Sequence, residues 1–172
     1  DQFVGSLLRE IGPRKNKDAG LTSLHIDSWE MGAQNWTGTF RDEFKRRRGY
    51  DALRYLPVFT GRVVESREVS ERFLWDVRQT AQELVIENHA QHLKELGRQH
   101  GLGLSIEPYD MNPTADLNLG AVADVPMCEF WANCFESWYS VFEAASIAHT
   151  GGKRIVAAES FTSDDKERWQ FH

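Results

Sequence analysis

Four short apolar runs in this 172-residue chain each end in a carboxylate that aromatic or polar residues follow at once. Runs of this length and composition are typical of strands buried in a parallel sheet. In a β/α barrel, the residues just past the carboxyl ends of such strands form the mouth of the active site. The runs are residues 24–30, 102–109, 125–131 and 155–160. The sequence therefore predicts one carboxylate-lined site at the common edge of several parallel strands.

Helical patterns separate these runs. Apolar residues recur at helical spacing in residues 2–11, in a long stretch from about 66 to 100, and in residues 136–150. A long helix followed by a buried strand is the repeating unit of βα architecture. We predict an α/β fold, namely part of a (β/α)8 TIM-type barrel with parallel strands and long crossover helices.

Three further segments have less regular patterns. Thr39 and Asp42 resemble a capping box, which predicts a helix beginning there with two phenylalanines on one face. Residues 50–65 predict either short strands or an irregular excursion, and residues 111–124 predict a loop before the third strand. The basic cluster at residues 45–48 falls in the last turn of the predicted helix, where cations complement the helix dipole, so we favour a solvated helix end over a binding patch.

The length of the chain limits how much of a barrel it contains. A complete eightfold barrel usually needs about 250 residues, and this chain has 172, begins at Asp1 and ends without a closing turn signal. We expect residues 1–172 to be part of a single catalytic barrel domain from a larger multidomain chain. Alone, such a piece leaves strand edges and apolar helix faces uncovered, so we expect it to be inactive and prone to aggregate.

Charge and hydropathy exclude two classes of partner. The formal net charge of -6 argues against a nucleic-acid surface, which depends on clustered Lys and Arg. No apolar stretch approaches the roughly 20 residues that cross a membrane as a helix. Cys128 lies on a predicted strand and Cys134 in the loop after it, so two free thiols are favoured over a bridge.

The carboxylates suit the hydrolysis of a glycosidic bond. That reaction needs one carboxylic acid to protonate the leaving oxygen and a second carboxylate to act as nucleophile or to activate water. The strand-terminal glutamates are Glu30, Glu107, Glu129 and Glu159. Any one of them is equally well explained as a salt bridge or a helix cap, but four at matching positions favour a shared site.

Aromatic side chains accompany these acids, and their rings can stack on the C–H faces of a sugar. The alternative is that the rings cap the barrel core. The residues concerned are Trp29, Trp36, Tyr109, Phe130 and Trp131. Asp27, Asp110 and Asp116 offer a different possibility, a site for a hard cation held by carboxylate oxygens.

One long motif resembles a known family. Residues 25–37, which read His-Ile-Asp-Ser-Trp-Glu-Met-Gly-Ala-Gln-Asn-Trp-Thr, together with residues 40–44 and 47–51, resemble the large bacterial α-L-rhamnosidases of glycoside hydrolase family 106. The resemblance extends over most of the chain and includes residues 105–109 and 157–160. The first motif is specific, whereas the later ones are weak when taken alone.

The resemblance implies a mechanism and a set of site residues. That family is a multidomain β/α barrel enzyme that inverts configuration and uses calcium. Its two catalytic glutamates best fit Glu30 as the acid and Glu159 as the base, and Glu107 and Glu129 are the reserves, as catalytic groups, calcium ligands or acceptors for sugar hydroxyls. The expected substrate-binding residues are Asp27, Trp29, Glu107, Tyr109, Glu129 and Trp131.

The resemblance implies a glycosidase that cleaves terminal α-L-rhamnosyl residues from oligo- or polysaccharides, in a parent protein that we expect to be periplasmic or secreted. One alternative is a retaining glycosidase for another sugar such as a galactoside, with Glu107 or Glu129 paired to Glu159. Another is a carbohydrate-binding barrel segment without catalysis, in which the acids only hold hydroxyls or calcium.

Overall fold

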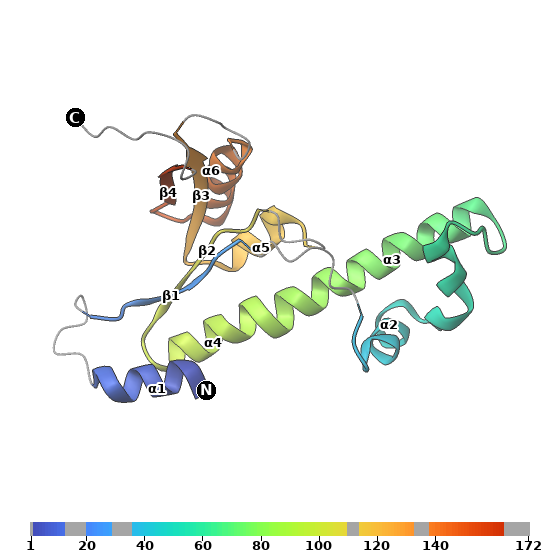
Figure 1. The fold of residues 1–172 in the computed structure, drawn as a ribbon, viewed down its shortest axis with the longest axis horizontal. Coiled ribbons are helices and arrows are strands. Elements are labelled where there is room, and N and C mark those ends of the chain that lie inside the picture. Colours follow the sequence, from blue (N-terminus) through green and yellow to red (C-terminus); the bar gives the residue numbers. More distant parts are fainter. Residues whose placement is uncertain (1, 13–19, 29–35, 110–113, 133–137, 164–172) are drawn as a thin grey trace.

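A computed structural model describes residues 2–12, 20–28, 36–109, 114–132 and 138–163 of the chain. Four strands form one parallel sheet whose spatial order follows the chain, as in the wall of a β/α barrel (Figure 1). The strands are β1 (Ser23–Ile26), β2 (Gly103–Ile106), β3 (Val125–Trp131) and β4 (Ala157–Thr162). The predicted α/β fold with parallel strands is confirmed.

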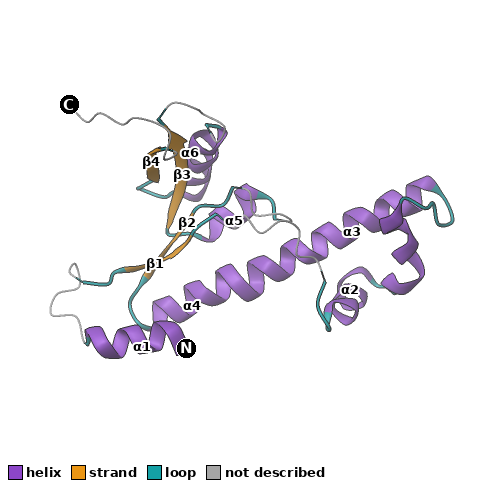
Figure 2. Ribbon diagram, viewed as in Figure 1, coloured by secondary structure: helices purple, strands orange, loops and turns teal. Residues whose placement is uncertain are grey.

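Helices connect the strands and cover the sheet (Figure 2). In chain order they are α1 (Gln2–Ile11), α2 (Phe40–Arg48), the 3-10 helix η1 (Ala52–Thr60), α3 (Arg67–Val85), the π-helix η2 (Ile86–Gln91), α4 (His92–Gln99), α5 (Asp116–Val122) and α6 (Tyr139–Gly151). None of the described helices is both long and apolar enough to cross a membrane.

The core of the sheet lies between β1, β2 and the helices. Ile26, Leu104 and Ile106 are buried there against Ala90 of η2 and Leu119 of α5. Because side chains alternate across a strand, the residues on either side of these apolar positions point to the opposite face of the sheet. That opposite face carries the acids.

One helix runs without interruption from Arg67 to Gln99, as α3, η2 and α4. It begins at Ser66, whose side chain accepts a hydrogen bond from the backbone N–H of Val69. Its length is about 50 Å, whereas the four residues of β2 span only about 13 Å. Since α4 contacts β2 and leads into it, the amino-terminal part of the long helix extends past the carboxyl ends of β1 and β2 (Figure 1).

The part of the chain that extends past the strands has its own core. We call residues 40–85, which comprise α2, η1 and α3, the helical extension. Phe44 is fully buried in it, 5.8 Å from the Phe73 ring and 5.0 Å from the Tyr50 ring, with both neighbours edge-on. Val77 and Ala81 of α3 complete this core. A parallel β/α wall and a helical extension therefore share one long helix.

Ion pairs fasten α2 to α3 at the end of α2. Arg47 is only 11% exposed and contacts Glu43 at 3.2 Å, Glu83 at 3.1 Å and Glu87 at 2.5 Å. Arg48 contacts Glu83 at 2.6 Å. The expectation of a solvated helix end is therefore wrong for these two arginines, because the last turn of α2 lies against α3.

Four local details of the structure differ from what the sequence pattern predicted. Thr39 precedes α2, but its side chain makes no cap hydrogen bond because its backbone is helical and not extended. Residues 50–65 hold η1 in place of strands, and residues 111–124 include α5, a helix too short to show a clear period. β4 begins at Ala157, four residues later than the start expected directly after the Gly-Gly pair at 151–152, because residues 153–156 are loop.

The Arg47 ion pairs predict a local stability effect. In the complete protein, Arg47→Ala removes the cation that three partly exposed glutamates share, and we expect backbone amides of residues 40–48 and 67–85 to exchange about tenfold faster. Hydrogen exchange read by mass spectrometry measures this. Arg67→Ala, which removes an exposed pair with Glu71, is the matched control and changes exchange little. Equal exchange in both variants would show that the pairs do not hold α2.

Candidate active site

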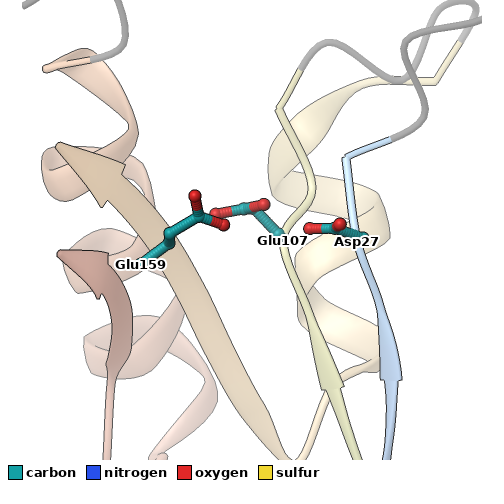
Figure 3. A group of neighbouring side chains, drawn as sticks. All are labelled: Asp27, Glu107 and Glu159. Carbon is teal, nitrogen blue, oxygen red and sulfur yellow. The ribbon is translucent and has the colours of Figure 1, made fainter. Parts of the chain in front are cut away.

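Three carboxylates from three strands converge on one face of the sheet. Asp27 follows β1, Glu107 follows β2 and Glu159 lies within β4, and one oxygen from each lies within 4.8 Å of the others (Figure 3). The backbone N–H of Glu107 donates to the carbonyl of Ile26 at 2.9 Å, so the parallel ladder continues to the acids. The predicted meeting of acids at the strand ends is therefore seen for these three residues.

Glu107 is the buried member of the group, with 1% of its surface exposed. Its Oε1 atom is buried and has no hydrogen-bond partner among the described residues. Burial, followed by hydrogen bonding to Asp27 and the negative charges of Asp27, Glu159 and Glu129, raises the pKa of Glu107 to about 8. Conversely, the hydrogen bond from Glu107 lowers the pKa of Asp27. A protonated Glu107 and an ionised Asp27 are the stable pair at neutral pH.

Glu129 and Tyr109 form a second buried pair beside this group. The Tyr109 hydroxyl donates to Glu129 Oε2, and burial raises the pKa of Tyr109. Ser140 of α6 accepts from the backbone N–H of Glu129 at 3.0 Å and donates to its carbonyl, also at 3.0 Å. Because Glu129 pairs in register with Glu159, these contacts tie the edge of the acid site to α6.

The other predicted site residues are placed as follows. Glu30 and Trp29 lie outside the described residues, as do Asp110 and Cys134. Asp116 is the first residue of α5 and takes no part in the three-carboxylate group. Trp131 ends β3 and is partly buried, and Cys128 is a buried free thiol. The catalytic and substrate-binding roles assigned from the sequence remain predictions.

Two polar residues next to the acids, His25 and Ser105, were not predicted from the sequence. His25 Nδ1 lies 3.0 Å from Ser105 Oγ, and His25 Nε2 lies 3.5 Å from Asp27 Oδ1. The available signal was the strand period, since residues two positions apart share a face of the sheet. His25 and Ser105 therefore lie two residues before Asp27 and Glu107, on the same face of the sheet. His25 contacts Asp27 there.

The group of three carboxylates suits a hard cation. Calcium takes six to eight oxygen ligands, many of them carboxylates, and here carboxylate oxygens of Asp27, Glu107 and Glu159 converge. Within the described ranges, no Lys or Arg forms an ion pair with any of the three. The buried Glu107 Oε1 without a partner is the atom that a bound cation would satisfy.

Acids at the ends of parallel strands in a β/α wall are the arrangement expected of a barrel glycosidase. Comparison with known families gives the same class. The family model of glycoside hydrolase family 106, described as alpha-L-rhamnosidase, matches residues 1–172. The chain belongs to this family, as its sequence motif predicted.

Two individual relatives are informative. A protein of Formosa agariphila described as "Putative beta-glucuronidase" is 45% identical over 137 residues, which cover 80% of this chain and 12% of that protein. The structure of a rhamnosidase from Novosphingobium sp. PP1Y superposes with a TM-score of 0.79 at 32% identity, and the match covers 93% of this chain and 16% of the rhamnosidase. The chain thus spans under a fifth of either relative.

Glu107 predicts a pH dependence of stability. The folded pKa of about 8 lies above the ordinary value of 4.5, so its stabilising contribution is complete below pH 4.5 and is lost as the pH rises through 8. We expect the melting temperature of the complete wild-type protein, measured by calorimetry with a chelator present, to fall between pH 5 and 8. The fall should be about 3–6 °C larger than in Glu107→Gln. Glu71→Gln, an exposed control, keeps the wild-type slope. Equal slopes for wild type and Glu107→Gln would contradict the assignment.

Proposed function

We propose that the protein containing this chain is a bacterial glycosidase that releases terminal α-L-rhamnosyl residues from oligo- or polysaccharides. The observation that carries the proposal is the convergence of strand-end carboxylates in a chain of the rhamnosidase family. In this proposal residues 1–172 form part of a single catalytic barrel domain, which the remaining domains of a larger periplasmic or secreted protein complete.

The proposed reaction inverts the configuration of the sugar. Glu30 donates a proton to the glycosidic oxygen while Glu159 removes a proton from the attacking water on the opposite face of the ring. Glu159 supports this role because it is exposed on the acid face, and the Thr162 hydroxyl donates to its Oε1 at 2.8 Å. An exposed, oriented carboxylate can hold a water molecule and accept its proton.

The arrangement disfavours the retaining alternative with Glu107 as nucleophile. Glu107 and Glu159 lie near enough for a retaining pair, whose carboxyl groups are about 5–5.5 Å apart. A nucleophile must however be ionised and must reach the anomeric carbon. Glu107 is buried and its pKa is raised to about 8, so it suits a supporting role better than nucleophilic attack.

We further propose that Asp27 and Glu107 hold a calcium ion beside Glu159, which stays free to act as the base. The support is the convergence of their oxygens and the partnerless buried oxygen of Glu107. When bound, the ion supplies positive charge that offsets the crowded carboxylates, and open coordination positions for sugar hydroxyls. His25 contacts Asp27 and holds it in place, and the surrounding chain shields Glu107 from water.

The Formosa agariphila relative favours a second candidate function, hydrolysis of a β-glucuronide by the same carboxylates. Both candidates use an acid and a base at the strand ends, and they differ in the sugar that the pocket accepts. Paired assays with an aryl α-L-rhamnoside and an aryl β-D-glucuronide decide between them.

Variants of the two proposed catalytic glutamates test the function. In the complete protein, we expect Glu30→Gln and Glu159→Gln each to lower kcat on an aryl α-L-rhamnoside by about 10²–10⁴-fold, the usual contribution of one acid–base group. Glu71→Gln, exposed on α3, is the control for loss of one carboxylate. Near wild-type turnover in either variant would make the pairing wrong and turn attention to Glu107 and Glu129. No turnover in the wild type would reject the rhamnosidase proposal.

Chelation tests the proposed calcium site. We expect a chelator to abolish turnover of the aryl rhamnoside, and excess Ca²⁺ to restore it better than Mg²⁺, which prefers a smaller octahedral site. Glu107→Asn, which shortens and neutralises the buried ligand, should raise the Ca²⁺ concentration for half-maximal activity by about tenfold or more. Full activity in chelator would exclude a required cation.

A further inference from the structure

A cavity of about 600 Å³ lies between α2 and the long helix, apart from the three-carboxylate group. Its lining combines Trp36 and the apolar side chains of Leu84 and Val85 with the planar polar groups of Arg46, Glu87 and Asn88. None of the contacts described for the acid site uses this cavity. Aromatic and apolar side chains with a few planar hydrogen-bonding groups are the usual lining of a pocket for a small ligand, and a sugar ring can use both.

The cavity borders the part of the long helix that packs against the sheet. Val85 lines the cavity and also packs against the sheet core that contains Ile26, the residue before Asp27. One turn earlier, Gln82 accepts a hydrogen bond at 2.7 Å from the backbone N–H of Ala115, in the segment between β2 and α5. The cavity therefore borders the part of the long helix that packs beside β1 and β2, the strands that Asp27 and Glu107 follow.

Trp36 offers a fixed and open ring to this cavity. Its centroid lies 4.9 Å from that of Phe40, which is 2% exposed and anchored in the core of the helical extension. Trp36 itself remains 47% exposed. An indole that is held from one side and left open on another can stack on a ligand without a large loss of side-chain entropy.

The charges in the cavity favour a neutral ligand. Arg46 and Arg47 line it together with Glu43 and Glu87, so two cations face two anions. Arg46 pairs with Glu43 at 2.7 Å, and Arg47 pairs with Glu87 at 2.5 Å. A phosphate or a polycation would meet a compensated surface, and a lipid tail would meet fixed polar groups. Neutral hydroxyls can instead bond to carboxylate and guanidinium edges that already hold their positions.

We propose that this cavity is a saccharide subsite that binds a neutral sugar ring on the leaving-group side of the substrate. In this proposal the terminal residue of the sugar chain occupies the acid site. The chain then passes the ends of β1 and β2, and its next rings stack on Trp36. This inference rests on the proposed glycosidase function and adds a longer substrate to it. It makes the helical extension a determinant of substrate length.

The test compares a short and a long substrate in the complete protein. The probes are an aryl α-L-rhamnoside and a neutral trisaccharide ending in α-L-rhamnose. We expect Trp36→Ala to lower kcat/KM for the trisaccharide at least about tenfold more than for the aryl rhamnoside, and Trp36→Phe to recover part of that loss. Trp75→Ala is the control, because Trp75 is a 53% exposed tryptophan on α3 that does not line the cavity.

Equal losses on both substrates, or no loss on the trisaccharide, would overturn the subsite and leave the proposed function standing. If the wild type cleaves neither substrate, the proposed function fails, and calorimetric titration with the trisaccharide decides the subsite separately. Binding that weakens about tenfold or more in Trp36→Ala but not in Trp75→Ala supports it. Absent binding, or equal binding in both variants, overturns it.

Discussion

Parallel pairing in register is the constraint on which the acid site depends. Ile26 pairs with Ile106, so Asp27 and Glu107 follow at the same height on neighbouring strands, and Glu129 pairs with Glu159 further along the longer strands β3 and β4. A slip of one residue in either strand would turn its carboxylate toward the helices and expose an isoleucine in its place. The buried isoleucines that pack against the long helix therefore fix the direction of the carboxylates on the other face.

The position of each strand in the sheet decides how its carboxylate behaves. β2 lies between β1 and β3, so Glu107 is covered on both sides, loses its hydration and acquires a raised pKa. β4 lies at the edge of these four strands, and Glu159 stays exposed. Two acids that follow similar apolar runs thus become one buried group with a raised pKa and one exposed group.

The same distinction shows how far the sequence could go. The alternation of apolar residues and acids was enough to predict the parallel sheet and the meeting of Glu107 with Glu159, because both follow from local pattern and strand direction. It could not rank their burial, which depends on how many strands flank each one. Nor could it identify η1, since a 3-10 helix containing Pro57 has neither the α-helical nor the strand period. The partners of Arg47 were hidden because Glu83 and Glu87 are remote in sequence.

The long helix joins the two halves of the structure and sets their relative orientation. Ala81 belongs to the core of the helical extension and Ala90 to the core of the sheet. Residues nine positions apart lie on opposite faces of an ideal α-helix, which has 3.6 residues per turn. The π-helix η2 begins at Ile86, between these two residues, and contains Ala90, and its wider turns change that phase by a fraction of a turn. Val85, the last residue of α3, packs on the sheet core and also lines the Trp36 cavity, so the π-helix begins where the two halves of the structure meet.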